Sequence, residues 1–141
     1  MDEIRVQIAS DSDTVVARQA GRDAALRVGL SRTEATFVAT AISEIARNIT
    51  VHAGRGEILI RARTEGERTG LLVVATDEGP GIADLNAVLR DDYTSQAGLG
   101  VGLWGARKLM DEITITSESG KGTTVSMTKW CGPNEVTGLL G

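Results

Sequence analysis

The chain has 141 residues, which suits one domain with one hydrophobic core. Hydrophobic residues make up 41% and charged residues 24%, the net charge is −4, and no basic stripe is present, so a nucleic-acid partner is not expected. The single cysteine, Cys131, excludes an internal disulfide. No apolar segment follows the acidic start at Met1–Glu3, and no run is long enough to span a membrane. We therefore expect a cytoplasmic protein with no membrane partner.

The first third of the chain predicts a strand and two helices. Residues 4–8 alternate between apolar and polar side chains, which indicates a half-buried strand. The cap-type residues 10–13 precede a helical pattern that Gly29 is placed to end. Ser31–Glu34 has the spacing of a capping box and predicts the start of a second helix, which runs to about Ala53.

The remaining elements are read in the same way. They are a strand over 57–63, a hydrophilic turn over 66–70, a buried central strand over 71–75, a turn over 77–81, a short helix over 83–89, a polar glycine-rich loop over 90–102, a helix over 103–110, and strands over 113–117 and 123–130. This order predicts an α+β fold: a two-layer α/β sandwich with helices on one face of a mixed, mostly antiparallel sheet. We place one domain over residues 1–130 and assign no role to the tail over 131–141.

The second predicted helix carries an unusual polar arc. Glu44, Asn48 and His52 are spaced i, i+4 and i+8, so they share one side of the helix. This arc lies apart from the apolar stripe and from the polar stripe that faces solvent. A helix that presents a carboxylate, an amide and an imidazole to one ligand would have this pattern. The alternative is a helix flank with ordinary surface hydrogen bonds.

Two glycine-rich segments follow. Asp77 comes directly after the buried strand, where a carboxylate can accept a hydrogen bond from an exocyclic amine such as that of adenine, and Gly79 and Gly81 would let the backbone pass a planar ring. A plain turn is the alternative. The three glycines within 98–102 precede a helix and expose consecutive N–H groups that suit phosphate oxygens. A flexible linker is the alternative there.

These segments occur in the order of the four motifs of the GHKL ATPase and kinase superfamily, which the chain resembles. The matching residues are Glu44 and Asn48 in the N box, Asp77, Gly79 and Gly81 in the G1 box, Gly98, Gly100 and Gly102 in the G2 box, and Gly120, Gly122 and Thr123 in the G3 box. Within the superfamily, residues 17–22, 41–48, 109–112 and 129–130 are most similar to the RsbT-type switch kinases of the bacterial stressosome. The likeness covers residues 4–130.

The resemblance implies a Bergerat ATP-binding fold and a role for each motif. Asn48 would ligate Mg²⁺, and Glu44 would be the base that orients or deprotonates the acceptor hydroxyl. Asp77 would bind the adenine amine with support from Thr123. The G1 glycines, Gly79 and Gly81, would lie along the base. The G2 glycines, Gly98, Gly100 and Gly102, would bind phosphates in a mobile lid.

The resemblance also implies an activity and partners. The chain would be a serine/threonine protein kinase that transfers the γ-phosphate of ATP to a STAS-domain regulator and then activates a downstream output protein. The alternative is an anti-sigma factor, or a non-catalytic protein of the same fold whose binding depends on nucleotide. His52 has a simpler interpretation as a structural or capping residue beside the site.

Overall fold

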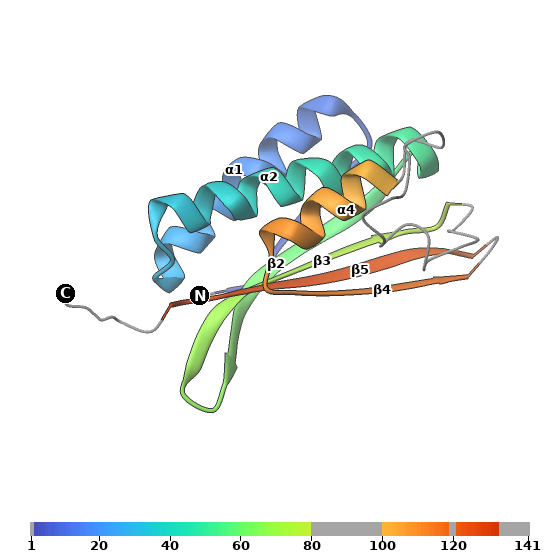
Figure 1. Cartoon of the computed structure of the whole chain (residues 1–141). Coiled ribbons are helices and arrows are strands. Elements are labelled where there is room, and N and C mark those ends of the chain that lie inside the picture. The colour runs from blue at the N-terminus through green and yellow to red at the C-terminus, as the bar shows by residue number, and fades with distance from the viewer. Residues whose placement is uncertain (1, 80–99, 119–120, 133–141) are drawn as a thin grey trace.

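The computed structural model describes residues 2–79, 100–118 and 121–132. Its elements are β1 (Ile4–Ile8), α1 (Asp11–Val28), α2 (Arg32–Asn48), η1 (Ile49–Ala53), β2 (Gly56–Glu65), β3 (Arg68–Asp77), α4 (Gly100–Leu109), β4 (Glu112–Glu118) and β5 (Gly122–Trp130). The helices lie on one face of the sheet, so the expected two-layer α+β sandwich is confirmed (Figure 1).

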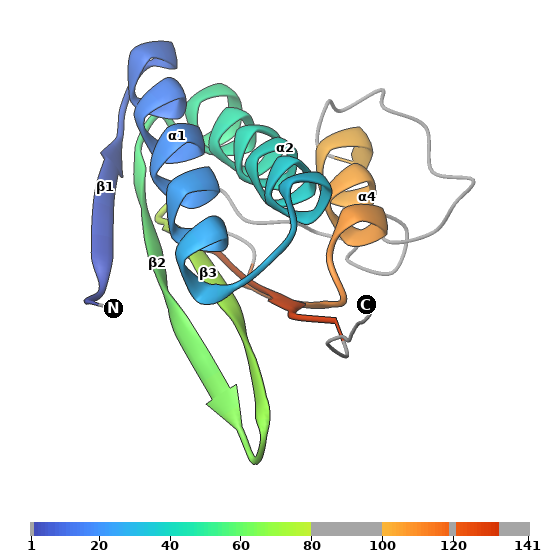
Figure 2. The ribbon, with the colours of Figure 1, turned by 90° about the vertical axis from the view of Figure 1, so that its left-hand side faces the viewer.

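The sheet has five strands in the order β1-β2-β3-β5-β4. All pairings among the described strands are antiparallel, so the expectation of a mixed sheet was wrong. The reason lies in the connections: β2–β3 and β4–β5 are joined directly, and β2 returns beside β1 in the opposite direction after the two helices. Figure 2 shows β1 at one edge of the sheet and the long β2–β3 hairpin extending beyond the helices.

Local sequence chemistry sets the ends of both N-terminal helices. The hydroxyl of Ser31 accepts from the backbone N–H of Glu34 at 3.1 Å, and the Glu34 carboxylate accepts from the N–H of Ser31 at 2.9 Å. This pair is the predicted capping box. Gly29 ends α1 with φ of 107°, a left-handed conformation that glycine adopts without steric cost.

Two predicted boundaries differ from the structure. The hydrophilic turn expected over 66–70 is confined to Gly66 and Glu67, because β3 already begins at Arg68 and pairs with the end of β2. Gly100 and Gly102, which we expected in a loop, lie in the first turn of α4. The helix expected over 83–89 and the loop residues 90–99 lie outside the described residues.

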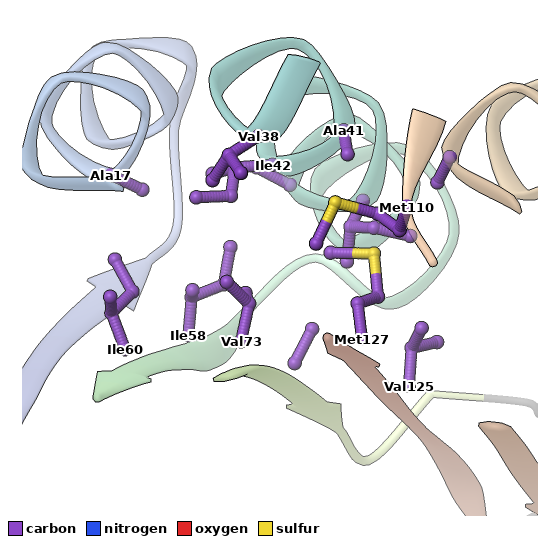
Figure 3. Close-up of a cluster of buried hydrophobic side chains, with 14 of the residues drawn as sticks. Ala17, Val38, Ala41, Ile42, Ile58, Ile60, Val73, Met110, Val125 and Met127 are labelled. Atoms are coloured by element: carbon purple, nitrogen blue, oxygen red, sulfur yellow. The ribbon is translucent and has the colours of Figure 1, made fainter. Parts of the chain in front are cut away.

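The hydrophobic core fills the space between the helices and the sheet (Figure 3). Buried residues that the figure labels are Ile58, Ile60, Val73, Val125 and Met127 on the strands, and Ala17, Val38, Ala41, Ile42 and Met110 from the helical side. Burying one large aliphatic side chain contributes roughly 1.5–3 kcal/mol. None of the helices in the described ranges is long and apolar enough to cross a membrane.

Candidate functional site

Four of the segments that carry or adjoin predicted site residues lie at one end of the molecule. The C-terminal end of α2, the segment η1, the end of β3 and the start of α4 all lie toward the right in Figure 1, close to where β4 ends and β5 begins. Helix α4 packs alongside α2, and the start of α4 lies toward the C-terminal end of α2 (Figure 1).

The predicted polar arc of α2 lies between the core and the solvent. Glu44, Asn48 and His52 are all half-buried, whereas Thr40 and Arg47 on the polar stripe are exposed. Asn48 Nδ2 and His52 Nε2 are buried atoms with no hydrogen-bond partner among the described residues. Most buried polar groups in folded proteins are paired, so these two nitrogens, without a partner among the described residues, are consistent with the predicted binding of a polar ligand.

The sequence predicted a helix that runs to about Ala53, but the regular α-helix ends at Asn48. It changes to a π-helical turn over Ile49–Ala53, and the N–H of Gly54 bonds to the carbonyl of Ile49 at 2.8 Å. Single π turns inside or after α-helices occur often at functional sites. This wider turn places Ala53 against Gly79: a methyl group on Gly79 would lie 2.6 Å from Ala53 Cβ. The π turn that follows the N box is therefore in direct contact with the G1 box.

Asp77 lies at the end of β3, as the sequence predicted. Its Oδ1 accepts a 2.9 Å hydrogen bond from the backbone N–H of Gly79, which fixes the carboxylate against the turn. Its other oxygen, Oδ2, has no partner within the part of the chain that the structure describes. Asp77 pairs across the sheet with Thr123 of β5 on one side and with Gly56 of β2 on the other.

Thr123 and its neighbours complete this end of the sheet. Thr123 Oγ1 lies 2.9 Å from Ser117 Oγ, and Ser117 Oγ donates to the carbonyl of Gly122 at 3.1 Å. Gly122 has φ of 104°, and a methyl group there would overlap the carbonyl oxygen of Asp77. Only glycine fits this position, so Gly122 of the G3 segment allows β5 to approach the end of β3.

The remaining predicted site residues are placed as follows. Gly81 and Gly98 lie outside the described residues. Gly100 and Gly102 belong to the first turn of α4, where the backbone N–H groups of a helix have no acceptor within the helix. A helix N-terminus of this kind favours the oxygens of a phosphate through its N–H groups and its dipole.

A cavity of about 710 Å³ opens beside Asp77. Its lining residues are Gln7, Ala53, Arg55, Gly56, Glu57, Thr76, Asp77 and Glu78. A second cavity, of about 740 Å³, lies between α4 and β4 and contains none of the motif residues. Of the predicted site residues only Asp77 lines the first cavity, so we define the candidate site by the positions of Asp77, Thr123 and the α2 arc and not by this cavity.

The described residues fit a magnesium ion that arrives with a nucleotide. Among them, no cluster of three or more His, Cys, Asp and Glu side chains could hold a resident metal. Mg²⁺ bound through substrate phosphates needs only one or two protein oxygens. Asn48 could offer its amide oxygen, since its amide nitrogen is buried without a partner in the part of the chain that the structure describes. When bound, the ion would neutralise charge on the phosphates.

Sequence reasoning did not find two features of this site. Ser117 was assigned only to a strand, although its hydroxyl faces that of Thr123 across the β4–β5 pair. The sequence offered one signal for this contact: two hydroxyl residues, Ser117 and Thr123, lie near the ends of adjacent predicted strands that a short turn joins. The π turn had no signal, because residues 49–53 continue the helical periodicity without a break.

The chain belongs to the family of histidine kinase-like ATPase domains, whose profile matches residues 8–129. It is 41% identical to the serine/threonine-protein kinase RsbT of Bacillus subtilis (strain 168) over 129 residues, which are 92% of this chain and 97% of that protein. It is 32% identical over 108 residues to an anti-sigma F factor of Thermoanaerobacter sp. (strain X514), with 72% and 74% of the two chains covered. An anti-sigma F factor of Caldanaerobacter subterraneus subsp. tengcongensis is 35% identical over 107 residues, with 72% and 73% covered.

Proposed function

We propose that this chain, a serine/threonine-protein kinase by its full-length relationship to RsbT, transfers the γ-phosphate of ATP to a hydroxyl on a STAS-domain regulator. The observation that carries the proposal is the pairing of Asp77 with Thr123 beside the π turn, on the same end of the molecule as the arc of Glu44 and Asn48. We also propose that the protein acts in the cytoplasm and that residues 1–130 form the kinase domain.

Each residue has a chemical task in this proposal. Asp77 accepts a hydrogen bond from the adenine amine, and Thr123, which lies beside Asp77, supports binding at the same edge of the base. Asn48 holds Mg²⁺, and the N–H groups at the start of α4 contact the phosphates. Glu44, one turn before Asn48, orients or deprotonates the acceptor hydroxyl. Phosphoryl transfer needs little covalent chemistry from the protein, so positioning and charge neutralisation are sufficient.

The acceptor has to come from another protein. Glu44 is half-buried on α2, so part of its side chain is exposed to a hydroxyl that arrives in trans. The test is incubation of the protein with Mg²⁺-ATP and a cognate STAS protein, followed by mass spectrometry of the partner. We expect one phosphate on one serine or threonine of the partner with wild-type protein and none with Glu44→Ala.

The second candidate is an anti-sigma factor, and its support is the two anti-sigma F relatives that share this domain. The two functions differ in a measurable way. A protein that binds a sigma factor tightly and adds no phosphate to any cognate STAS partner would contradict the kinase proposal and support the anti-sigma one. Binding of a downstream output protein after the STAS partner is phosphorylated would support the switch kinase.

A further inference from the structure

The hydroxyl of Ser117 has one proton to donate, and the local geometry determines where it goes. Ser117 Oγ donates to the carbonyl oxygen of Gly122 at 3.1 Å, and a carbonyl can only accept. The neighbouring hydroxyl of Thr123 lies 2.9 Å from the same Ser117 oxygen. Both contacts are hydrogen bonds at the same time only when the Ser117 proton goes to Gly122 and Thr123 is the donor in the pair of hydroxyls.

This direction decides what Thr123 offers to a ligand. Its proton faces Ser117, so the lone pairs of Thr123 Oγ1 remain for a hydrogen-bond donor. Thr123 is directly opposite Asp77 in the β3–β5 register, and both residues are half-buried on the helix side of the sheet. Since Gly79 occupies Oδ1 of Asp77, the two residues present two acceptors side by side, Asp77 Oδ2 and Thr123 Oγ1.

Two adjacent acceptors match one kind of purine edge. The 6-amino group of adenine carries two N–H donors, whereas a 6-oxo purine such as hypoxanthine or guanine presents an acceptor at the same position. We infer that Ser117 is a positioning residue for base selection: by holding the Thr123 proton, it makes the site favour a 6-amino purine over a 6-oxo purine. This inference rests on the proposed binding of ATP at Asp77.

The test is the ratio of affinities for ADP and IDP, measured by calorimetry with Mg²⁺. These nucleotides differ at the purine edge that Asp77 and Thr123 face. Wild-type protein should prefer ADP. In Ser117→Ala the Thr123 hydroxyl can rotate and donate to a 6-oxo group, so the ADP-to-IDP affinity ratio should fall about three- to tenfold while ADP still binds. A general loss of stability would not change this ratio selectively.

Two further variants separate positioning from packing. Ser117→Thr keeps the hydroxyl and should restore the wild-type ratio. Ser117→Cys nearly keeps the volume, but its thiol is a weak donor and acceptor, so it should lower the ratio and gives the same answer if Ser117→Ala does not fold. The matched control is Thr116→Ala, an exposed neighbour whose side chain lies on the other face of β4 and whose loss should leave the ratio unchanged.

The outcomes distinguish this inference from the function on which it rests. If wild-type protein prefers ADP and folded Ser117→Ala or Ser117→Cys keeps the full preference, the inference is overturned and the proposed function stands. Equal affinity of wild-type protein for ADP and IDP also overturns it. If wild-type protein binds neither nucleotide, the proposed function fails together with the inference.

Discussion

The indole N–H of Trp130 donates a 2.7 Å hydrogen bond to Oε2 of Glu112 on the sheet face that the helices leave uncovered. Arg63 adds a 3.1 Å ion pair to the same carboxylate and lies over the Trp130 ring, with its Cζ 4.9 Å from the ring centroid. Arg68 stacks on that ring as well, at 4.0 Å. The cluster joins β2, β3, β4 and β5 at the end of the sheet away from the candidate site.

The hydrogen bond from Trp130, and after it the contacts with Arg63, hold the pKa of the Glu112 carboxyl below its ordinary value. A carboxyl with a lowered pKa stabilises the fold above its unfolded pKa of about 4.3, and this contribution is lost as the pH falls through the folded value. We therefore predict that Glu112→Gln lowers the free energy of unfolding at pH 7, and that the difference from wild type shrinks below about pH 4. Urea unfolding over a pH series measures it.

The control for this prediction is Glu67→Gln at the exposed tip of the β2–β3 hairpin, which should change little at any pH. A difference between Glu112→Gln and wild type that stays constant from neutral to acid pH would show that the Trp130 bond does not prefer the carboxylate.

Asp77→Asn should weaken ADP binding about 10- to 100-fold and leave the fold intact. The new side chain can still accept from the Gly79 N–H through its amide oxygen, so the turn survives. Its NH₂ group would then replace the Oδ2 acceptor. Because this NH₂ group and the adenine amine are both donors, no hydrogen bond would form between them. Calorimetry with ADP measures the affinity, with Thr69→Ala, exposed near the other end of β3, as the control. Unchanged affinity in folded Asp77→Asn would place adenine elsewhere.

Gly122→Ala should destabilise the protein and remove nucleotide binding together. The position has φ of 104°, which costs a residue with a side chain about 1–3 kcal/mol, and the added methyl group would overlap the carbonyl oxygen of Asp77. Thermal unfolding and ADP titration measure the two effects. Gly132→Ala is the matched control, because a methyl group there meets nothing within 4 Å. Equal melting temperatures for the two variants would contradict the close approach.

Features that depend on residues close together in the sequence could be predicted, and features that depend on distant residues could not. The capping box at Ser31 and Glu34 depends on residues three apart, so it was read directly and is confirmed. The place of Asp77 at a strand end followed from the adjoining apolar run. That Thr123 supports Asp77 was predicted only through the resemblance, and the register that places the two opposite each other was not predicted, because the pairing of β3 with β5 joins distant parts of the chain.

The π turn could not be predicted from the sequence. Residues 49–53 have ordinary helix-compatible side chains, and their conformation accompanies the contact between Ala53 and Gly79, which forms only in the folded protein. Ser117 was missed for a similar reason. Its importance comes from the direction of a hydrogen bond, which follows from the carbonyl of Gly122 and not from the identity of a serine in a strand.

The last prediction separates the roles of Glu44 and Asn48, which lie one turn apart on the half-buried arc of α2. Asn48→Ala should remove the part of ADP affinity that depends on Mg²⁺, since the amide oxygen is the proposed ligand. Glu44→Ala should bind ADP and Mg²⁺ nearly as well as wild type and lower phosphate transfer to the partner about 10²–10⁴-fold, because a base acts in the chemical step. Calorimetry with and without Mg²⁺ and single-turnover transfer measure the two effects separately.

Thr40→Ala is the control for both variants, because Thr40 is exposed on the polar stripe of the same helix, one turn before Glu44. It should keep both nucleotide affinity and transfer. Equal loss of nucleotide affinity in Glu44→Ala and Asn48→Ala would show that both side chains serve binding. Full transfer by Glu44→Ala would show that another residue is the base. The group to replace next is then His52, one turn beyond Asn48, whose buried Nε2 has no partner among the described residues.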